Sequence, residues 1–232
     1  MPPPETTPTP DTTSPYWQAR SQLPLERLDE IHDAVVTEAE AGLATRDLWC
    51  GLRVFALDGT TLTAPDTAEN QAAFPQQKGQ RPGCGFPILR LVAFFALATG
   101  MITGWIHGAY GQSELALLQH LWEHLRPGEL LLGDRGFCTW GLLAQCRARQ
   151  VHAVFRVRGS RRRDFRRGQR LSPDEREVHW TKPTLRPRTI TAAEWNRLPA
   201  SLTLRLVRSR VEVRGFRTRQ VILVTTLLDR DA

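Results

Sequence analysis

Hydrophobic and polar residues alternate along this chain in an order that predicts a mixed α/β fold. Short apolar runs predict five strands, at residues 52–58, 86–98, 101–110, 129–133 and 151–157. Apolar residues at helical spacing predict two helices between the later strands, at 114–125 and 139–149. The predicted order is therefore one strand, a hairpin of two strands, a helix, a strand, a helix and a strand.

Two of these strands deliver an aspartate to a glycine-containing turn. Asp58 ends the first predicted strand and Asp134 ends the fourth. The order of elements describes a ribonuclease-H-like mixed sheet flanked by helices, in which the first strand lies beside the fourth. Asp58 and Asp134 should then meet, and two such carboxylates repel each other unless a cation lies between them. Mg²⁺ or Mn²⁺ is the cation expected, because both prefer hard oxygen ligands.

The pattern divides the chain into four parts. Residues 1–22 are rich in Pro and Thr and are expected to be a disordered tail, and 23–50 hold one helix. The ribonuclease-H-like core is expected over 51–157. Residues 158–232 alternate in short strand-like runs, and we expect an antiparallel β-rich insertion there, with the start of a return to the core.

Charge also differs between the parts of the chain before and after Arg156. Before Arg156 there are 11 basic and 16 acidic residues, and from Arg156 onward there are 20 basic and 8 acidic ones. A basic region joined to an acidic site favours a polyanionic substrate, above all nucleic acid. The candidate DNA contacts are the arginines of one polar run: Arg161, Arg162, Arg163, Arg166, Arg167 and Arg170. A solvated loop would explain that run equally well.

Other residue types narrow the classes of function. No apolar run is long enough to cross a bilayer, and the N-terminus lacks an export signal, so a cytoplasmic location is expected. The four cysteines form no CxxC pair, which favours reduced thiols over a zinc site. His120 and His124 lie four residues apart and could grip a metal, although a helix with two surface histidines is the commoner arrangement.

Five stretches resemble the insertion-sequence-four family of bacterial DDE transposases. These stretches are residues 57–62, 65–70, 132–137, 195–199 and 223–229. The resemblance implies a function in DNA transposition, with double-stranded DNA (transposon ends and target) as partner, a nucleoid-associated location and the option of a homodimer. It also implies two metal ions, with Asp58 bridging both and Asp134 holding one.

The third catalytic residue of that family is a glutamate on a helix after the stretch matching 223–229, and the given sequence stops at Ala232. We therefore expect little catalysis from this chain and an exposed apolar patch near the first strand. Two alternatives stay open: an active metal-dependent nuclease using another third carboxylate, and a non-catalytic DNA-binding protein using only its arginines.

Overall fold

The computed structural model describes residues 15, 19, 22–81, 83–159, 165–210 and 220–229. Its chain forms two compact units, 1–42 and 43–232, and each is described by itself. The first contains helix α2 (Leu25–Ala41), the helix expected within 23–50, whose Leu25, Leu28 and Ile31 are exposed. Among the described residues, no helix is both long and apolar enough to cross a membrane.

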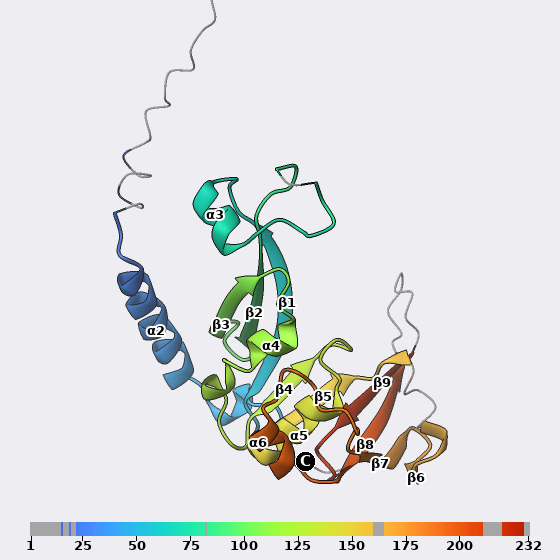
Figure 1. The fold of residues 1–232 in the computed structure, drawn as a ribbon. Helices are drawn as coiled ribbons and strands as arrows, with labels where there is room; N and C mark the ends of the chain where they lie inside the picture. The colour runs from blue at the N-terminus through green and yellow to red at the C-terminus, as the bar shows by residue number, and fades with distance from the viewer. Residues whose placement is uncertain are drawn as a thin grey trace, which may run out of the picture. The chain divides into compact units, whose positions relative to one another are not determined.

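The second unit is built on one mixed sheet with the strand order β3-β2-β1-β4-β5-β9-β8-β7-β6 (Figure 1). The strands are β1 (Val54–Thr63), β2 (Ile88–Ala96), β3 (Ile102–Ala109), β4 (Leu130–Gly133), β5 (His152–Arg156), β6 (Gln169–Ser172), β7 (Glu175–Thr181), β8 (Ser201–Arg210) and β9 (Gln220–Thr225). β4 pairs in parallel with β1 and β5, and the other pairings are antiparallel. The ribonuclease-H-like fold is confirmed: its first five strands lie in the order expected.

Short helices pack against one face of this sheet. They are α4 (Glu114–Leu118), α5 (Trp140–Ala148) and α6 (Ala192–Arg197), while α3 (Ala68–Ala73) lies at the far end of the β1–β2 ribbon (Figure 1). Ser113 and Thr139 begin α4 and α5, because each side-chain oxygen accepts a hydrogen bond from a backbone N–H of the first turn. The core between helices and sheet includes Phe55 and Leu57 of β1.

Two boundaries differ from the sequence expectations. The first strand does not end at Asp58: β1 continues to Thr63, because its antiparallel pairing with β2 runs on to Ile88. The helix expected over 114–125 was wrong in length. After Leu118 the backbone tightens into i→i−3 hydrogen bonds and then a 3₁₀ turn, η2 (Trp122–His124), although Leu121 and Leu125 stay buried.

The basic region forms antiparallel strands as expected, but they extend the core sheet. β9 pairs with β5, and β8, β7 and β6 follow outward. Trp180 is buried on β7. Trp195 lies on α6 and meets the Trp140 ring edge-on, with centroids 5.4 Å apart.

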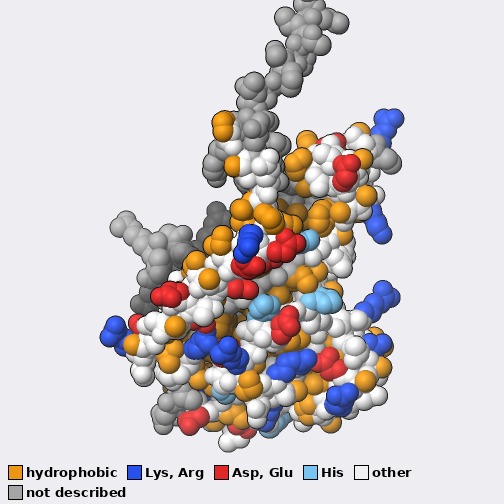
Figure 2. Space-filling model, turned by 90° about the vertical axis from the view of Figure 1, so that its left-hand side faces the viewer, with side chains coloured by type: hydrophobic (Ala, Val, Ile, Leu, Met, Phe, Trp, Pro, Cys, Tyr) orange, Lys and Arg blue, Asp and Glu red, His pale blue; other side chains and the backbone are white. Residues whose placement is uncertain are grey.

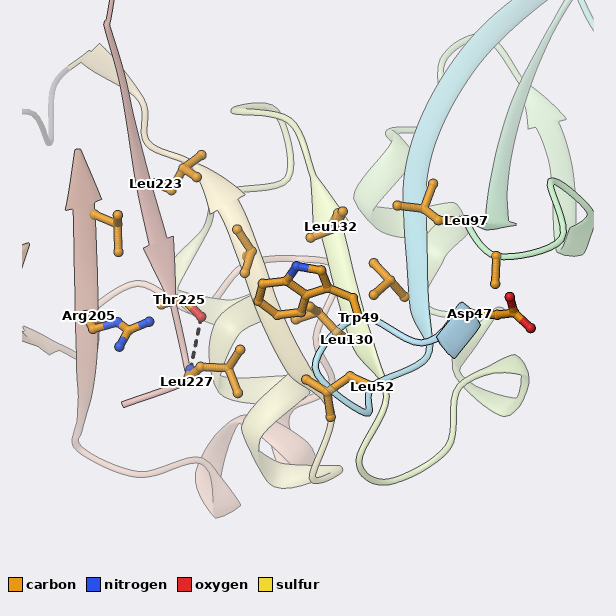
Figure 3. Close-up of a pocket in the computed structure, with 14 residues that line it drawn as sticks. Asp47, Trp49, Leu52, Leu97, Leu130, Leu132, Arg205, Leu223, Thr225 and Leu227 are labelled. Carbon is orange, nitrogen blue, oxygen red and sulfur yellow. Dashed lines mark hydrogen bonds between the residues drawn. The ribbon is translucent and has the colours of Figure 1, made fainter. Parts of the chain in front are cut away.

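The other face of the sheet carries an apolar trough of about 570 Å³ (Figure 3). Its floor comes from β1, β4, β5 and β9, through Val54, Leu130, Leu132, Val154 and Leu223. Trp49 lies across the middle, and Arg205 and Thr225 lie toward one end. Trp49 is 50% exposed and Leu97, at the other end, is 55% exposed. An apolar patch beside the first strand is therefore present in the described chain.

An ion pair joins the beginnings of β1 and β4. Arg53 Nη1 lies 3.2 Å from Glu129 Oε1, and the backbone N–H of Arg126 donates to Glu129 Oε2 at 2.6 Å. Only 7% of the Glu129 side chain is exposed. Burial raises the pKa of Glu129, and the Arg126 N–H and the Arg53 charge offset this only in part.

The raised pKa of Glu129 predicts the pH dependence of stability. The Glu129 carboxyl group binds its proton more tightly in the folded chain than in the unfolded chain, and this difference stabilises the fold. The stabilisation is complete below the unfolded pKa of 4.5 and is lost as pH rises through the higher folded pKa. Relative to Glu129→Gln, the wild-type free energy of unfolding should fall as pH rises from about 4 to about 7. Urea unfolding measures it, with the exposed Glu26→Gln as control. A difference that stays flat would contradict the prediction.

Candidate catalytic and metal site

The pairing of β1 with β4 brings the two predicted aspartates together. Val54 pairs with Leu130 and the register continues to Leu57 with Gly133. Asp58 in β1 and Asp134, the first residue after β4, occupy the next position in this register, and paired strands lie about 4.8 Å apart. Both side chains are exposed. The strands that carry these aspartates are adjacent, as expected: Asp134 directly follows β4, and Asp58 lies within β1 and not at its end.

Each carboxylate is oriented by a backbone N–H that follows it in the chain. The N–H of Gly59 donates to Asp58 Oδ1 at 2.8 Å, and the N–H of Gly136 donates to Asp134 Oδ1 at 2.5 Å. An ionised carboxylate has about four lone-pair positions, so one such bond leaves room for a cation. Local backbone geometry therefore orients both carboxylates and leaves their oxygens able to accept further bonds.

The glycines beside the aspartates lie close to side-chain carboxyl groups. A Cβ at Gly136 would lie 2.8 Å from Asp134 Oδ1, and one at Gly59 would lie 2.7 Å from the Glu114 carboxyl carbon. Glu114, the first residue of α4, is thus a neighbour of the site that no sequence pattern could reveal, since its contact is with a residue 55 positions earlier. Side chains at either glycine would displace a carboxylate.

The donor set suits a hard divalent cation. Two exposed carboxylates on adjacent strands match Mg²⁺ or Mn²⁺, which bind through one or two carboxylates and retain several waters. In the described ranges, no three or more His, Cys, Asp or Glu side chains are grouped to hold a metal. His120 and His124 are therefore not part of such a group in the described ranges. The aspartate pair would therefore supply only part of a coordination shell.

The candidate DNA contacts lie far from the aspartates in the sheet. Arg161, Arg162 and Arg163 fall outside the described residues, while Arg166, Arg167 and Arg170 are described and exposed. Arg170 is on β6, and five strands separate β6 from β1. Six strand spacings amount to on the order of 30 Å. The structure therefore does not bring these arginines to the aspartate pair.

A buried phenylalanine anchors the described end of the arginine run. Phe165 is 6% exposed, and the guanidinium groups of Arg176 and Arg208 lie 4.9 and 4.5 Å from its ring centroid. Arg208 also pairs with Asp174 at 2.7 Å. These contacts leave Arg166 and Arg167 at the surface.

Charges of both signs are interspersed on the face seen in Figure 2, so that face offers no field of a single sign.

Comparison with known proteins supports the resemblance seen in the sequence. Residues 49–216 match the family described as Transposase DDE domain. Transposase InsG for insertion sequence element IS4, from Escherichia coli (strain K12), is 36% identical over 95 residues, which are 41% of this chain and 22% of InsG. InsZ of the same strain, named provisionally as a transposase, is 26% identical over 134 residues, which are 56% of this chain and 44% of InsZ. The chain thus spans less than half the length of either relative.

The space beside Gly136 gives a test of the Asp134 carboxylate. In Gly136→Ala the new methyl group would push Asp134 Oδ1 away, and affinity for Mn²⁺ should fall by about tenfold, the scale of changes next to a metal ligand. Titration of free Mn²⁺ by electron paramagnetic resonance measures it. Gly111→Ala, where nothing lies within 4 Å, is the matched control. Equal affinities in both variants would contradict the prediction.

Proposed function

The chain belongs to the family of transposase DDE domains, and from this premise we propose that it serves metal-dependent phosphoryl transfer on DNA during transposition. One observation carries the proposal. Asp58 and Asp134, the aspartates of the two family-like motifs, follow the parallel register of β1 and β4 at the same level of the sheet. Both are exposed, and both are oriented by backbone N–H groups.

The family resemblance implies a division of roles at the site. Divalent cations, when bound, would activate a water molecule or a DNA 3′-hydroxyl as the nucleophile and would neutralise charge on the phosphate. Asp58 would contact both ions and Asp134 one. The N–H groups of Gly59 and Gly136 would hold the two carboxylates in place, which avoids reorganisation when the cations bind.

The apolar trough bears on the third carboxylate. Val54, Ala56 and Asp58 alternate along β1 and so point to one face, and Val54 lines the trough. In the family, a helix carrying a glutamate follows the stretch matching residues 223–229, and here Leu227 also lines the trough. We propose that such a helix would cover the trough and bring its carboxylate to the aspartate pair. Without it, metal binding would be weak.

Double-stranded DNA is the proposed partner. The region from Arg156 onward carries 20 basic against 8 acidic residues, and nearly all the basic ones are arginine, whose planar fork suits phosphate. Separation from the aspartates by on the order of 30 Å suits a long duplex and not a small nucleotide. Transposon ends and target as the DNA segments, a homodimer, and a cytoplasmic, nucleoid-associated location remain parts of this proposal.

One contact favours the nuclease alternative. The carboxyl group of Glu114 lies close to Gly59, the residue after Asp58, and is therefore a candidate for another third carboxylate. Successive residues of a strand point to opposite faces, so Glu114 meets β1 on the face opposite to the one Asp58 faces. The transposase reading therefore remains the better supported one.

Cleavage of DNA bearing the ends of a related element tests the proposed function. The chain extended by the family's glutamate helix should cleave with Mg²⁺ or Mn²⁺, and Asp58→Asn or Asp134→Asn should lower the rate by a factor on the order of 10³, as loss of a metal ligand implies. The chain ending at Ala232 should show little cleavage. Comparable cleavage by both, lost in Glu114→Gln, would overturn the transposase reading in favour of the nuclease.

Salt dependence tests the proposed DNA surface. Each phosphate that a side chain neutralises adds about 0.9 to the steepness of log affinity against log salt, so replacing Arg166, Arg167 and Arg170 by Gln should flatten the slope by up to about 2.7. Fluorescence anisotropy of labelled duplexes measures affinity. The matched control replaces Arg46, Arg81 and Arg126, three exposed arginines from before the basic region. Equal changes in both triple variants would show only an effect of net charge.

A further inference from the structure

Arg158 holds the turn that follows Asp134. Its Nε donates to the carbonyl oxygen of Arg135 at 2.8 Å, and its Nη2 donates to that of Gly136 at 2.7 Å. The two acceptors are successive carbonyls, so the planar guanidinium fork spans both at once. Arg158 itself lies two residues beyond the end of β5, where the arginine-rich run begins.

The first of these bonds reaches the Asp134 carboxylate through a single peptide group. The carbonyl of Arg135 and the N–H of Gly136 belong to the same planar amide. Arg158 binds the oxygen end of that amide, and Asp134 Oδ1 accepts from its N–H end at 2.5 Å. A cation at the oxygen polarises the amide and strengthens its N–H as a donor, since hydrogen bonds in a chain reinforce one another.

The geometry also fixes the direction of the carboxylate. Rotation of the 135–136 amide would break the bonds to Arg158 and to Asp134 together, so the guanidinium resists it. Gly136 has no side chain to hold the turn, and a Cβ there would collide with Asp134 Oδ1. Within the turn, the N–H of Phe137 donates to the carbonyl oxygen of Asp134 at 3.3 Å, and Arg158 adds two further hydrogen bonds from another segment, 22 residues away.

We propose that Arg158 is a positioning residue for Asp134, which it orients for metal binding through the amide between Arg135 and Gly136. This inference rests on the proposed function, because it takes Asp134 as a metal ligand. It assigns Arg158 a role distinct from that of the neighbouring arginines, which are proposed to contact DNA phosphates.

A double-mutant cycle in Mn²⁺ affinity tests the assignment, with free Mn²⁺ followed by electron paramagnetic resonance. Arg158→Ala should weaken Mn²⁺ binding by about tenfold. Arg158→Lys should recover part of that loss, because it keeps the charge but cannot bridge both carbonyls. In an Asp134→Asn background, Arg158→Ala should change Mn²⁺ affinity no further. The control is Arg147→Ala, an exposed arginine that donates to the Thr203 carbonyl, and its affinity should match the wild type.

Each other outcome has one meaning. An equal loss from Arg158→Ala in both backgrounds would show general structural support and overturn the positioning role. No loss from Arg158→Ala, with a clear loss from Asp134→Asn, would overturn the positioning role and leave the proposed function intact. No loss from Asp134→Asn would remove Asp134 as a metal ligand, and the positioning role with it. If Arg158→Ala failed to fold by circular dichroism, Arg158→Lys would carry the same cycle.

Discussion

The parallel pairing of β1 with β4 is the constraint on which the candidate site depends. Side chains alternate in direction along a strand, so a shift of one residue would expose the buried Phe55 and Leu57 and bury their neighbours. The Arg53–Glu129 pair further fixes the beginnings of the two strands. Burial of these apolar side chains therefore also fixes the register that places Asp58 beside Asp134, so the geometry of the site depends on the packing of the core.

The basic region is held firmly to that core. It shares the sheet through β5 and β9, and a buried polar network joins α5 to α6. Gln145, 1% exposed, donates to Gln119 Oε1 at 2.6 Å and to Glu194 Oε1 at 3.1 Å, and Arg149 pairs with Glu194 at 2.9 Å. Removal of the buried Gln145 would cost Gln119 and Glu194 one hydrogen bond each. The arginine-bearing strands and the aspartates are thus carried by one continuous framework.

The sequence was sufficient for the strand order and the adjacency of the aspartates, because both follow from local periodicity and the order of elements. It was insufficient wherever a distant segment decides the outcome. The Asp58-Gly59 pair predicts a turn, yet β1 continues past it because it pairs with β2. Leucine spacing located the buried face after Ser113 but not the break at Leu118. The contacts of Glu114 and Arg158 with the site join residues far apart in sequence and have no local pattern.

The apolar trough and the aspartate pair pose a single physical problem, since Val54 and Asp58 face the same side of β1. A helix covering Trp49 and the trough would remove water from the neighbourhood of two like charges and so strengthen their repulsion. A bound cation would turn the same removal of water into stronger attraction. Covering the trough with a helix is therefore unfavourable when the aspartates hold no metal ion, and favourable when they hold one. By reciprocity, whatever segment covers the trough should bind more tightly when the aspartates hold a cation, and should tighten the cation in turn.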